Sequence, residues 1–349
     1  METSTKFSNT EIVLLISNSI ISKLFLVYPS AFSALGASAS LLLATVTALL
    51  GFPFAMLLCN LCKKDVSVIF KSKIMSLLFI ALFICNQGYF IRSVAENLKL
   101  SILPDSPMFF ILLIFIAGVL VCSHTGLKAI IRAHSFVTPF TLSLVFFLVI
   151  SSVGNFDFYN LFPVMGKGKT MFLYLPLLLA YFADFIILLL VLPFASEKSN
   201  IKKIVYPSYI ISSIVLVSVI GVYTLVIPPN ASDNFFIPIY RVAQYINYQS
   251  FMARMESVFT IGWMLSFFLT SSTYVYLTSM LIGRILKVKS YRPYMYFTAA
   301  VILILSFVPN NINSLVRYSN YFSIPRLVLC MIIPIIILAL QKHKEAKKK

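Results

Sequence analysis

The sequence consists of long apolar runs separated by short basic loops. A membrane-spanning helix needs about 20 mostly apolar residues, whereas a helix on a soluble core shows an apolar stripe on one face only. Of the 349 residues, 60% are hydrophobic and 11% are charged, against about 25% charged in ordinary soluble domains. The lipid bilayer is therefore the predicted solvent for most of this chain.

Ten runs are long and apolar enough to be read as spanning segments. We accordingly predict an all-α polytopic membrane protein of about ten transmembrane helices. The segments are 12–35, 38–60, 74–98, 107–123, 131–152, 171–194, 204–227, 255–283, 294–309 and 323–341.

The basic residues divide unequally between the two sides that these segments define. Cytoplasmic loops keep an excess of Lys and Arg. Nineteen of the 28 fall on the side of the termini, against five (Lys99, Lys167, Lys169, Arg241 and Arg317) on the other. Both termini are therefore predicted to be cytoplasmic, and the number of spans to be even.

Several function classes are disfavoured. The net charge of +17 is spread over loops between apolar segments and forms no continuous basic face, so no nucleic-acid binding is predicted. Hydrolase, zinc-protease and P-loop motifs are absent, and the three histidines stand far apart. Cys59 and Cys62 form one C-x-x-C without a second pair or a nearby histidine. We predict no enzyme, no metal site and no cofactor.

Two ionisable residues lie deep inside predicted spans. Lys23 is about eleven residues into the first span and Asp184 about thirteen into the sixth, near the membrane midplane at ~1.5 Å per residue. Such groups usually mark a solute pathway or a pair. We expect both to face one cavity, as an ion pair or as ligands of a charged or zwitterionic solute. The alternative is a purely structural pair.

Neighbouring residues extend this candidate site. Ser22 and Tyr181 are assigned to it with Lys23 and Asp184 as solute-binding residues. In the eighth span Ser271 and Ser272 also lie at midplane depth, where hydroxyls can coordinate a cation, although bonding back to their own helix is the commoner use.

Other residues are predicted to shape or gate the bundle. Arg254 and Glu256 at the mouth of the eighth span are two apart, so each should have its own partner. Pro29 lies inside the first span, where it can break the helix. Arg92 and Glu96 are spaced to pair on one helix face. Asn86 is expected to join helices rather than contact a solute.

Three stretches resemble the spore germination permease family, the B-type subunits of bacterial germinant receptors, within the amino acid/polyamine/organocation transporter superfamily. The first is Asn155-Phe-Asp-Phe-Tyr-Asn-Leu-Phe-Pro-Val164, the second is Phe236-Ile-Pro-Ile-Tyr-Arg241, and the third runs from Arg254 and Glu256 through Phe259 to Trp263. The resemblance covers essentially the whole chain.

The resemblance implies two inverted five-helix repeats of the LeuT type, with the first and sixth helices broken at the midplane. The expected organisation is one membrane domain, with repeats over about 12–152 and 171–309, a final helix over 323–341 and a basic tail over 342–349. The family favours small residues in the first break, where this chain has Ser22, Lys23 and Leu24. A lysine there would occupy a cation position or select an anionic solute.

The resemblance also implies a role and partners. It predicts germinant sensing in the spore inner membrane, with a larger A-type subunit, a lipoprotein C-type subunit and a small-molecule germinant such as an amino acid, nucleoside or ion. Two alternatives remain open at this point. One is an active transporter of an amino acid or cation, and the other is a scaffold whose polar groups only hold its partners.

Overall fold

The computed structural model describes residues 6–26, 28–62, 70, 72–196, 200–229, 237–246 and 255–346. Within these ranges the chain is helical, and the β pairing is confined to an isolated bridge between Phe7 and Ala195. The all-α prediction is confirmed.

Thirteen α-helices are described in these ranges. They are α1 (Asn9–Ile21), α2 (Tyr28–Gly36), α3 (Ser40–Cys62), α5 (Lys73–Ser101), α6 (Met108–His124), α7 (Leu127–Ser152), α8 (Leu175–Leu179), α9 (Ile187–Val191), α10 (Ile201–Val226), α12 (Pro238–Tyr245), α13 (Met255–Ile285), α14 (Pro293–Ser306) and α15 (Ile312–Ala346). The 3₁₀ segments are η1 (Ser22–Phe25), η2 (Ala37–Ala39), η3 (Val153–Asn155), η4 (Phe158–Leu161), η5 (Lys169–Tyr174), η6 (Ala180–Ile186) and η7 (Leu192–Phe194).

Each of the ten predicted segments coincides with helical structure. Among the described residues, seven helical stretches are long and apolar enough to cross a membrane. The other three segments contain shorter helices: α1 has 13 residues before η1 interrupts the first segment, α6 has 17 and α14 has 14. The last helix begins at Ile312 rather than near 323.

The first and sixth segments are not continuous α-helices. After α1 the chain tightens into η1, and Leu26 leaves the helical region with φ −85° and ψ −128°. Pro29 then occupies the first turn of α2, where its missing N–H removes a donor that has no intrahelical acceptor anyway. In the sixth segment the seven residues of η6 separate α8 from α9. Runs of 3₁₀ helix this long are uncommon and often mark hinges.

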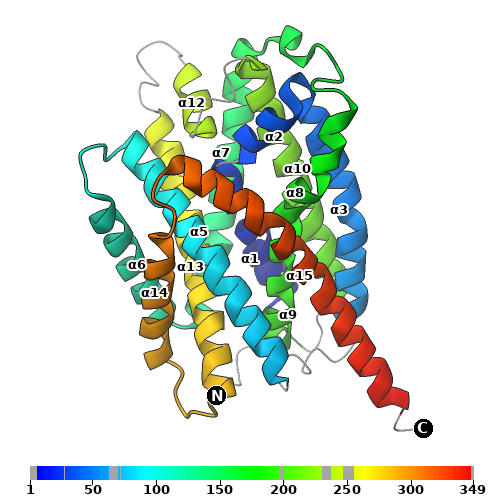
Figure 1. Cartoon of the computed structure of the whole chain (residues 1–349), viewed down its shortest axis with the longest axis vertical. Helices are drawn as coiled ribbons and strands as arrows, with labels where there is room; N and C mark the ends of the chain where they lie inside the picture. The colour runs from blue at the N-terminus through cyan, green and yellow to red at the C-terminus, as the bar shows by residue number, and fades with distance from the viewer. Residues whose placement is uncertain are drawn as a thin grey trace.

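Helix α1 lies inside the bundle and packs against α7, α10, α13 and η6 (Figure 1). Most of its residues from Ile12 onward are buried. Helices α6 and α14 lie at one edge, where Ile114 and Ile304 are about 70% exposed. Exposed apolar side chains on edge helices fit a protein whose surroundings are lipid.

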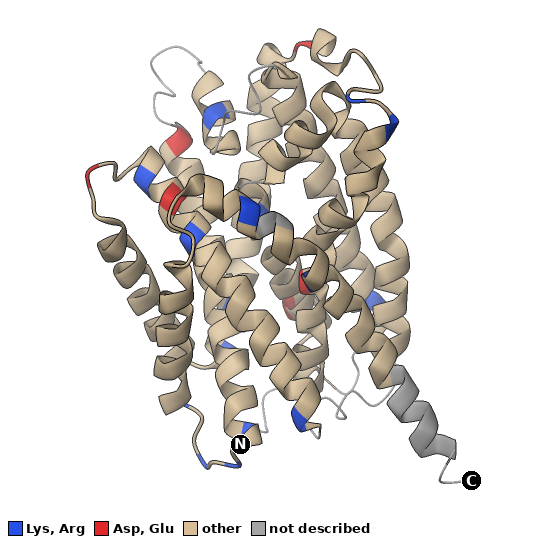
Figure 2. Cartoon of the chain, in the orientation of Figure 1, with Lys and Arg blue, Asp and Glu red and all other residues tan. Residues whose placement is uncertain are grey.

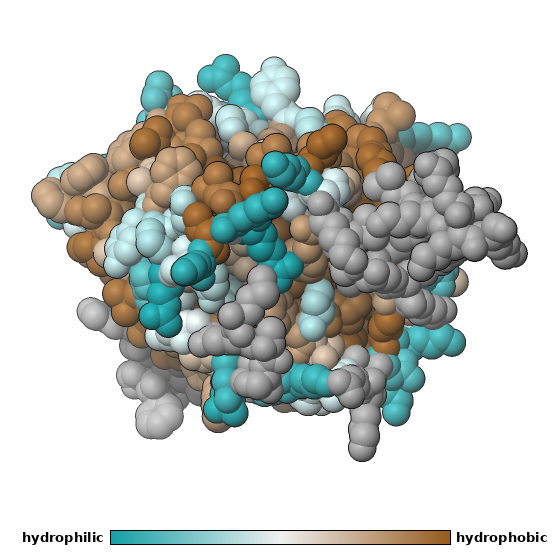
Figure 3. All heavy atoms as spheres, turned by 90° about the horizontal axis from the view of Figure 1, so that it is seen from below, coloured by the Kyte–Doolittle hydropathy of each residue, from teal (hydrophilic) through white to brown (hydrophobic). Residues whose placement is uncertain are grey.

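The first and last described helices have their outer ends at the same end of the bundle, which we call the terminal end (Figure 1). Helices α2 and α12 lie at the opposite end. Charged bands lie at both ends of the bundle, and several also lie between the ends (Figure 2). In the view of the terminal end, hydrophilic side chains run across the middle of the surface, and hydrophobic side chains lie beside them (Figure 3).

Candidate functional site

The two helix interruptions meet at a buried ion pair. Lys23 in η1 bonds through Nζ to Oδ2 of Asp184 in η6, and the two residues are 0% and 2% exposed. The structure thus brings together the two charged residues that the sequence analysis placed in one cavity. The pair joins segments 161 positions apart in the sequence at the points where both helices depart from α geometry.

Two neutral groups hold the other oxygen of the Asp184 carboxylate. Tyr274 of α13 donates its hydroxyl to Oδ1 at 2.6 Å, and Asn86 of α5 donates Nδ2 to the same oxygen at 3.5 Å. The Lys23 ammonium also lies 4.5 Å from the centroid of the Phe90 ring, which favours a cation on its face. The carboxylate is thus held by α5, α13 and η1 together.

Arg326 of α15 is a third charged residue of this cluster. Its Nη1 donates to Asn86 Oδ1 at 2.8 Å, and its Nη2 donates to the Tyr28 hydroxyl at 2.9 Å and to the backbone oxygen of Ala180. Tyr28 begins α2 and Ala180 begins η6. Arg326 therefore touches both interrupted helices directly at their breaks.

Sequence reasoning missed Arg326 because the last span was predicted to begin at residue 323. Arg326 then appeared to lie at a membrane boundary, where long basic side chains reach water. In the structure α15 begins at Ile312, which puts Arg326 well inside the helix and 3% exposed. The available signal was a lone arginine immediately before an apolar run.

The other predicted solute-binding residues lie beside this cluster. The Tyr181 ring packs edge-on against Tyr28 with 5.5 Å between centroids, and its hydroxyl donates to the Ser212 backbone oxygen at 3.3 Å. The Ser22 hydroxyl donates to Ser19 of its own helix, whereas the Ser22 backbone oxygen accepts from Trp263 Nε1 at 3.0 Å. Ser22 therefore contacts α13 through its backbone oxygen and not through its hydroxyl.

The hydroxyls of the eighth segment mostly bond back to their own helix. Thr270, Ser272 and Thr273 each donate to the residue four positions earlier at 2.9 Å. Ser271 differs, because its buried hydroxyl has no hydrogen bond among the described residues. The described ranges also contain no cluster of three His, Cys, Asp or Glu side chains that could hold a metal.

A neutral network close to these hydroxyls involves His134, which the sequence did not single out. Its ring nitrogens lie 3.1 Å from Asn18 Nδ2 of α1 and 3.1 Å from Thr273 Oγ1 of α13. His134 itself is on α7 and fully buried. This side chain therefore connects α1, α7 and α13 about one turn from Ser22.

The predicted gating residues lie near the end opposite the termini. Pro29 is buried in the first turn of α2, and Glu256 is half-buried in the first turn of α13. Arg254 lies outside the described residues. Arg92 and Glu96 form the predicted pair on α5, with 2.6 Å between Nη2 and Oε1. Asn86, expected to join helices, does so between η6 and α15.

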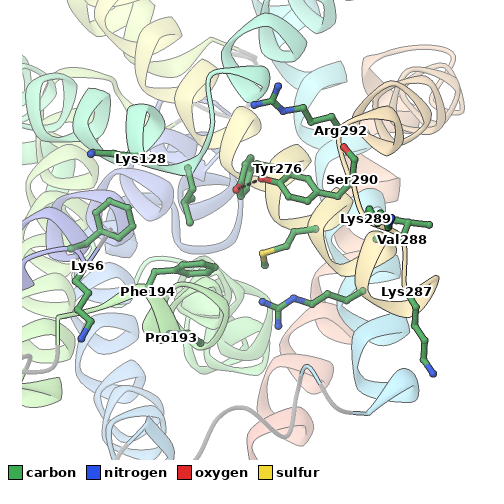
Figure 4. Close-up of a pocket in the computed structure, with 16 residues that line it drawn as sticks. Lys6, Lys128, Pro193, Phe194, Tyr276, Lys287, Val288, Lys289, Ser290 and Arg292 are labelled. Carbon is green, nitrogen blue, oxygen red and sulfur yellow. Dashed lines mark hydrogen bonds between the residues drawn. The ribbon is translucent and has the colours of Figure 1, made fainter. Parts of the chain in front are cut away.

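The cavities on the two sides of the cluster differ in size. Toward the terminal end, a cavity of about 620 Å³ is lined by Phe7, Phe194 and Tyr276 among others, with a basic rim of Lys6, Lys128, Arg284, Lys287, Lys289 and Arg292. In Figure 4 the Lys6, Lys128 and Lys287 side chains extend away from its middle. The pocket on the other side, bounded by Phe25, Phe259 and Trp263, holds about 20 Å³.

The fold is that of known transporters. The structure of MhsT in complex with L-phenylalanine superposes with a TM-score of 0.69 at 10% identity, over 95% of this chain and 88% of that one. The manganese transporter of Eremococcus coleocola, in complex with an aromatic bis-isothiourea substituted compound, gives 0.55 at 13% identity over 96% and 81%. These likenesses confirm the LeuT-type fold.

Sequence relatives come from Bacillus subtilis (strain 168). Spore germination protein YndE is 24% identical over 293 residues, which are 79% of this chain and 76% of the relative. Spore germination protein B2 is 28% identical over 147 residues (41% and 39%), and spore germination protein KB is 21% identical over 245 residues (67% and 64%).

The family match extends over nearly the whole chain. A family profile described as "Spore germination protein" matches residues 6–315. Together with the fold, it describes a permease-like membrane protein rather than an enzyme. This chain is a multi-pass membrane protein of LeuT-type fold that belongs to the spore germination protein family.

Proposed function

We propose that this chain is the germinant-sensing membrane subunit of a spore germinant receptor, and that a small solute binds at the Lys23–Asp184 cluster. The observation that carries the proposal is the buried ion pair between the two helix interruptions. Each charge at this depth costs about 2.5–3.5 kcal/mol on insertion scales. Apolar residues of similar size often stabilise a fold as well or better, so a functional use accounts for keeping the charges.

The site is arranged so that binding can change the bundle. A solute with a charged group competes with one member of the Lys23–Asp184 pair. Loosening that pair uncouples η1 from η6, and 3₁₀ segments within helices often act as hinges. Because a ligand shifts a conformational equilibrium only through its different affinity for the two states, the paired and separated arrangements supply the two states that sensing needs.

The remaining assignments complete this proposal. The termini face the cytoplasm, the chain resides in the spore inner membrane, and its partners are an A-type subunit and a lipoprotein C-type subunit. The inverted repeats cover about 12–152 and 171–309. Ser22 and Tyr181 contribute to the solute site, Ser271 and Ser272 to a cation-like site, and Pro29, Glu256 and Arg254 to gating.

The test is the germination response of spores that carry Lys23→Met, measured across amino acids, nucleosides and salts at matched protein level. Lys73→Met is the control, because Lys73 is exposed at the start of α5. A changed solute preference in Lys23→Met alone supports the proposal. An unchanged response at normal abundance makes Lys23 structural and rejects it.

A working transporter is the second candidate, favoured by the LeuT-type fold and by the 620 Å³ cavity toward the terminal end. Alternating access would pass a solute from the midplane cluster into that cavity. Uptake of radiolabelled amino acids into vesicles separates the two functions. Accumulation that requires Asp184 identifies a transporter, whereas saturable binding without accumulation identifies a sensor.

A further inference from the structure

The charges buried in the described residues do not balance. Five charged side chains are buried: Lys23, Arg92, Glu96, Asp184 and Arg326. Arg92 pairs with Glu96, and Lys23 pairs with Asp184. No carboxylate of the described ranges lies within ion-pairing distance of Arg326. The cluster at the helix breaks therefore holds two cations and one anion.

Arg326 is also incompletely hydrogen-bonded. Its three bonds go to neutral oxygens, on Asn86, Tyr28 and Ala180. Its Nε is buried and has no hydrogen bond among the described residues. A guanidinium presents its donors as a planar fork that matches a carboxylate bidentately, so the fork of Arg326 is only partly used.

The unbalanced cation belongs to the same cluster as the ion pair. The Asn86 amide donates to Asp184 and accepts from Arg326. The Phe90 ring lies 4.5 Å from the Lys23 ammonium and 5.6 Å from the Arg326 guanidinium carbon. One aromatic ring is thus close to two cations, which repel each other in a medium of low dielectric constant.

We infer that the solute of this site carries a carboxylate, and that Arg326 binds it. Buried charges are normally paired, and one negative charge from the solute neutralises the cluster. Arg326 donates to Tyr28, which begins α2, and to Ala180, which begins η6. A carboxylate that accepts these hydrogen bonds in place of the two oxygens loosens both interrupted helices from α15. This inference rests on the proposed solute site and specifies the chemical class of its ligand.

The experiment measures ligand stabilisation of the purified full chain in lipid nanodiscs. The probes are two matched series: L-alanine, L-alaninamide and propionate, and L-phenylalanine, L-phenylalaninamide and 3-phenylpropionate. A ligand that binds only the folded state raises the unfolding midpoint by an amount that grows with the ratio of its concentration to its Kd. In at least one series we expect the acid and the amino acid to raise the midpoint and the amide, which lacks the carboxylate, to leave it unchanged.

Substitutions on α15 assign the effect to Arg326. Arg326→Gln should weaken carboxylate binding at least about tenfold, equivalent to about 1.4 kcal/mol, and Arg326→Lys should weaken it less. Arg317→Gln is the matched control, because Arg317 is exposed on the same helix, and it should bind as the unsubstituted chain does.

The possible results separate this inference from the proposed function. Amides that bind as well as acids, or acid preference that survives Arg326→Gln, overturn the carboxylate assignment and leave the solute site standing. A nucleoside or a metal salt that stabilises the chain while every carboxylate fails has the same meaning. If no solute of any class changes the midpoint, both the carboxylate assignment and the solute site are rejected. The acid and amide comparison needs no variant, so misfolding of Arg326→Gln does not prevent a decision.

Discussion

At the scale of single residues, removing one member of the Lys23–Asp184 pair should destabilise the chain more than removing both. Removing one partner leaves a buried charge uncompensated, which typically costs 3–5 kcal/mol, whereas removing both costs much less. We therefore expect Asp184→Asn to destabilise the chain by about 3–5 kcal/mol, and the double variant Lys23→Met with Asp184→Asn to recover most of that loss.

Thermal unfolding in nanodiscs measures this coupling. Lys169→Met provides the control, since Lys169 is exposed at the start of η5, and it should shift the midpoint very little. Additive effects of the two single substitutions would contradict the ion pair that links η1 to η6, because independent sites add and contacting sites do not.

Substitution of His134 tests the buried hydrogen bonds that connect α1, α7 and α13. His134→Leu leaves Thr273 and Asn18 without their buried ring contacts, and an unmade buried hydrogen bond costs about 1–3 kcal/mol. His134→Gln keeps hydrogen-bonding groups at the site and should cost less. The midpoints of the two variants compare them directly. Equal loss in both would indicate that ring packing, rather than hydrogen bonding, is what His134 supplies.

At the scale of elements, the segment between α7 and α8 is tied to the half-helix that follows the first break. Ser38 donates to the Pro163 backbone oxygen at 2.6 Å, and Lys167 Nζ donates to the Ala34 backbone oxygen at 2.5 Å. Gly166 lies so close that a Cβ there would fall 1.9 Å from the Gly36 oxygen. The segment is therefore packed against α2 as one unit.

Two glycines of this segment form a matched pair for testing that unit. Gly166 and Gly168 both have positive φ, at 42° and 77°, but a Cβ on Gly168 meets nothing within 4 Å. Gly168 has φ 77° and ψ −164°, a backbone region that only Gly adopts readily, so Gly168→Ala should cost about 1–3 kcal/mol of backbone strain and no clash. Gly166→Ala adds the clash with α2. Limited proteolysis across 153–170 should therefore cut Gly166→Ala faster, and equal rates would contradict the close packing.

At the scale of elements, the sequence predicted the helical segments but not all of the contacts between them. All ten segments were found because length and apolarity are local properties. The breaks in the first and sixth helices were anticipated from family resemblance, and Pro29 gave a local signal for the first. The seven-residue extent of η6 had no such signal. Arg326 and Asn86 were missed as a joined pair because their meeting depends on how α5 packs against α15.

At the scale of the whole molecule, the charge pattern and the position of the termini give a topology that can be tested. Lys169 and Lys289 are exposed at opposite ends of the bundle. We expect Lys169→Cys to react with a membrane-impermeant maleimide in intact cells, and Lys289→Cys to react only after permeabilisation. The unsubstituted chain gives the baseline, because its five cysteines are buried or half-buried. The reverse pattern would invert the predicted orientation.

The terminal end also connects the two interrupted helices. Phe7 donates its backbone N–H to the Phe194 oxygen at 3.0 Å, and Ser196 donates to the Phe7 oxygen at 2.9 Å. The chain that leads into α1 is thus bonded to the chain that leaves η7. The first and sixth segments are therefore joined at the Lys23–Asp184 pair and again at the terminal end.

The solute site at the Lys23–Asp184 pair is tested most directly by the solute concentration that gives half-maximal germination, compared between variants of two buried ion pairs. Lys23→Met and Asp184→Asn change the pair at the helix breaks, whereas Glu96→Gln changes the pair on α5 alone. At matched abundance, this concentration should change by at least about tenfold for the first two variants, about 1.4 kcal/mol of binding free energy, and change little for Glu96→Gln. Equal effects of all three variants would contradict a solute site at this pair.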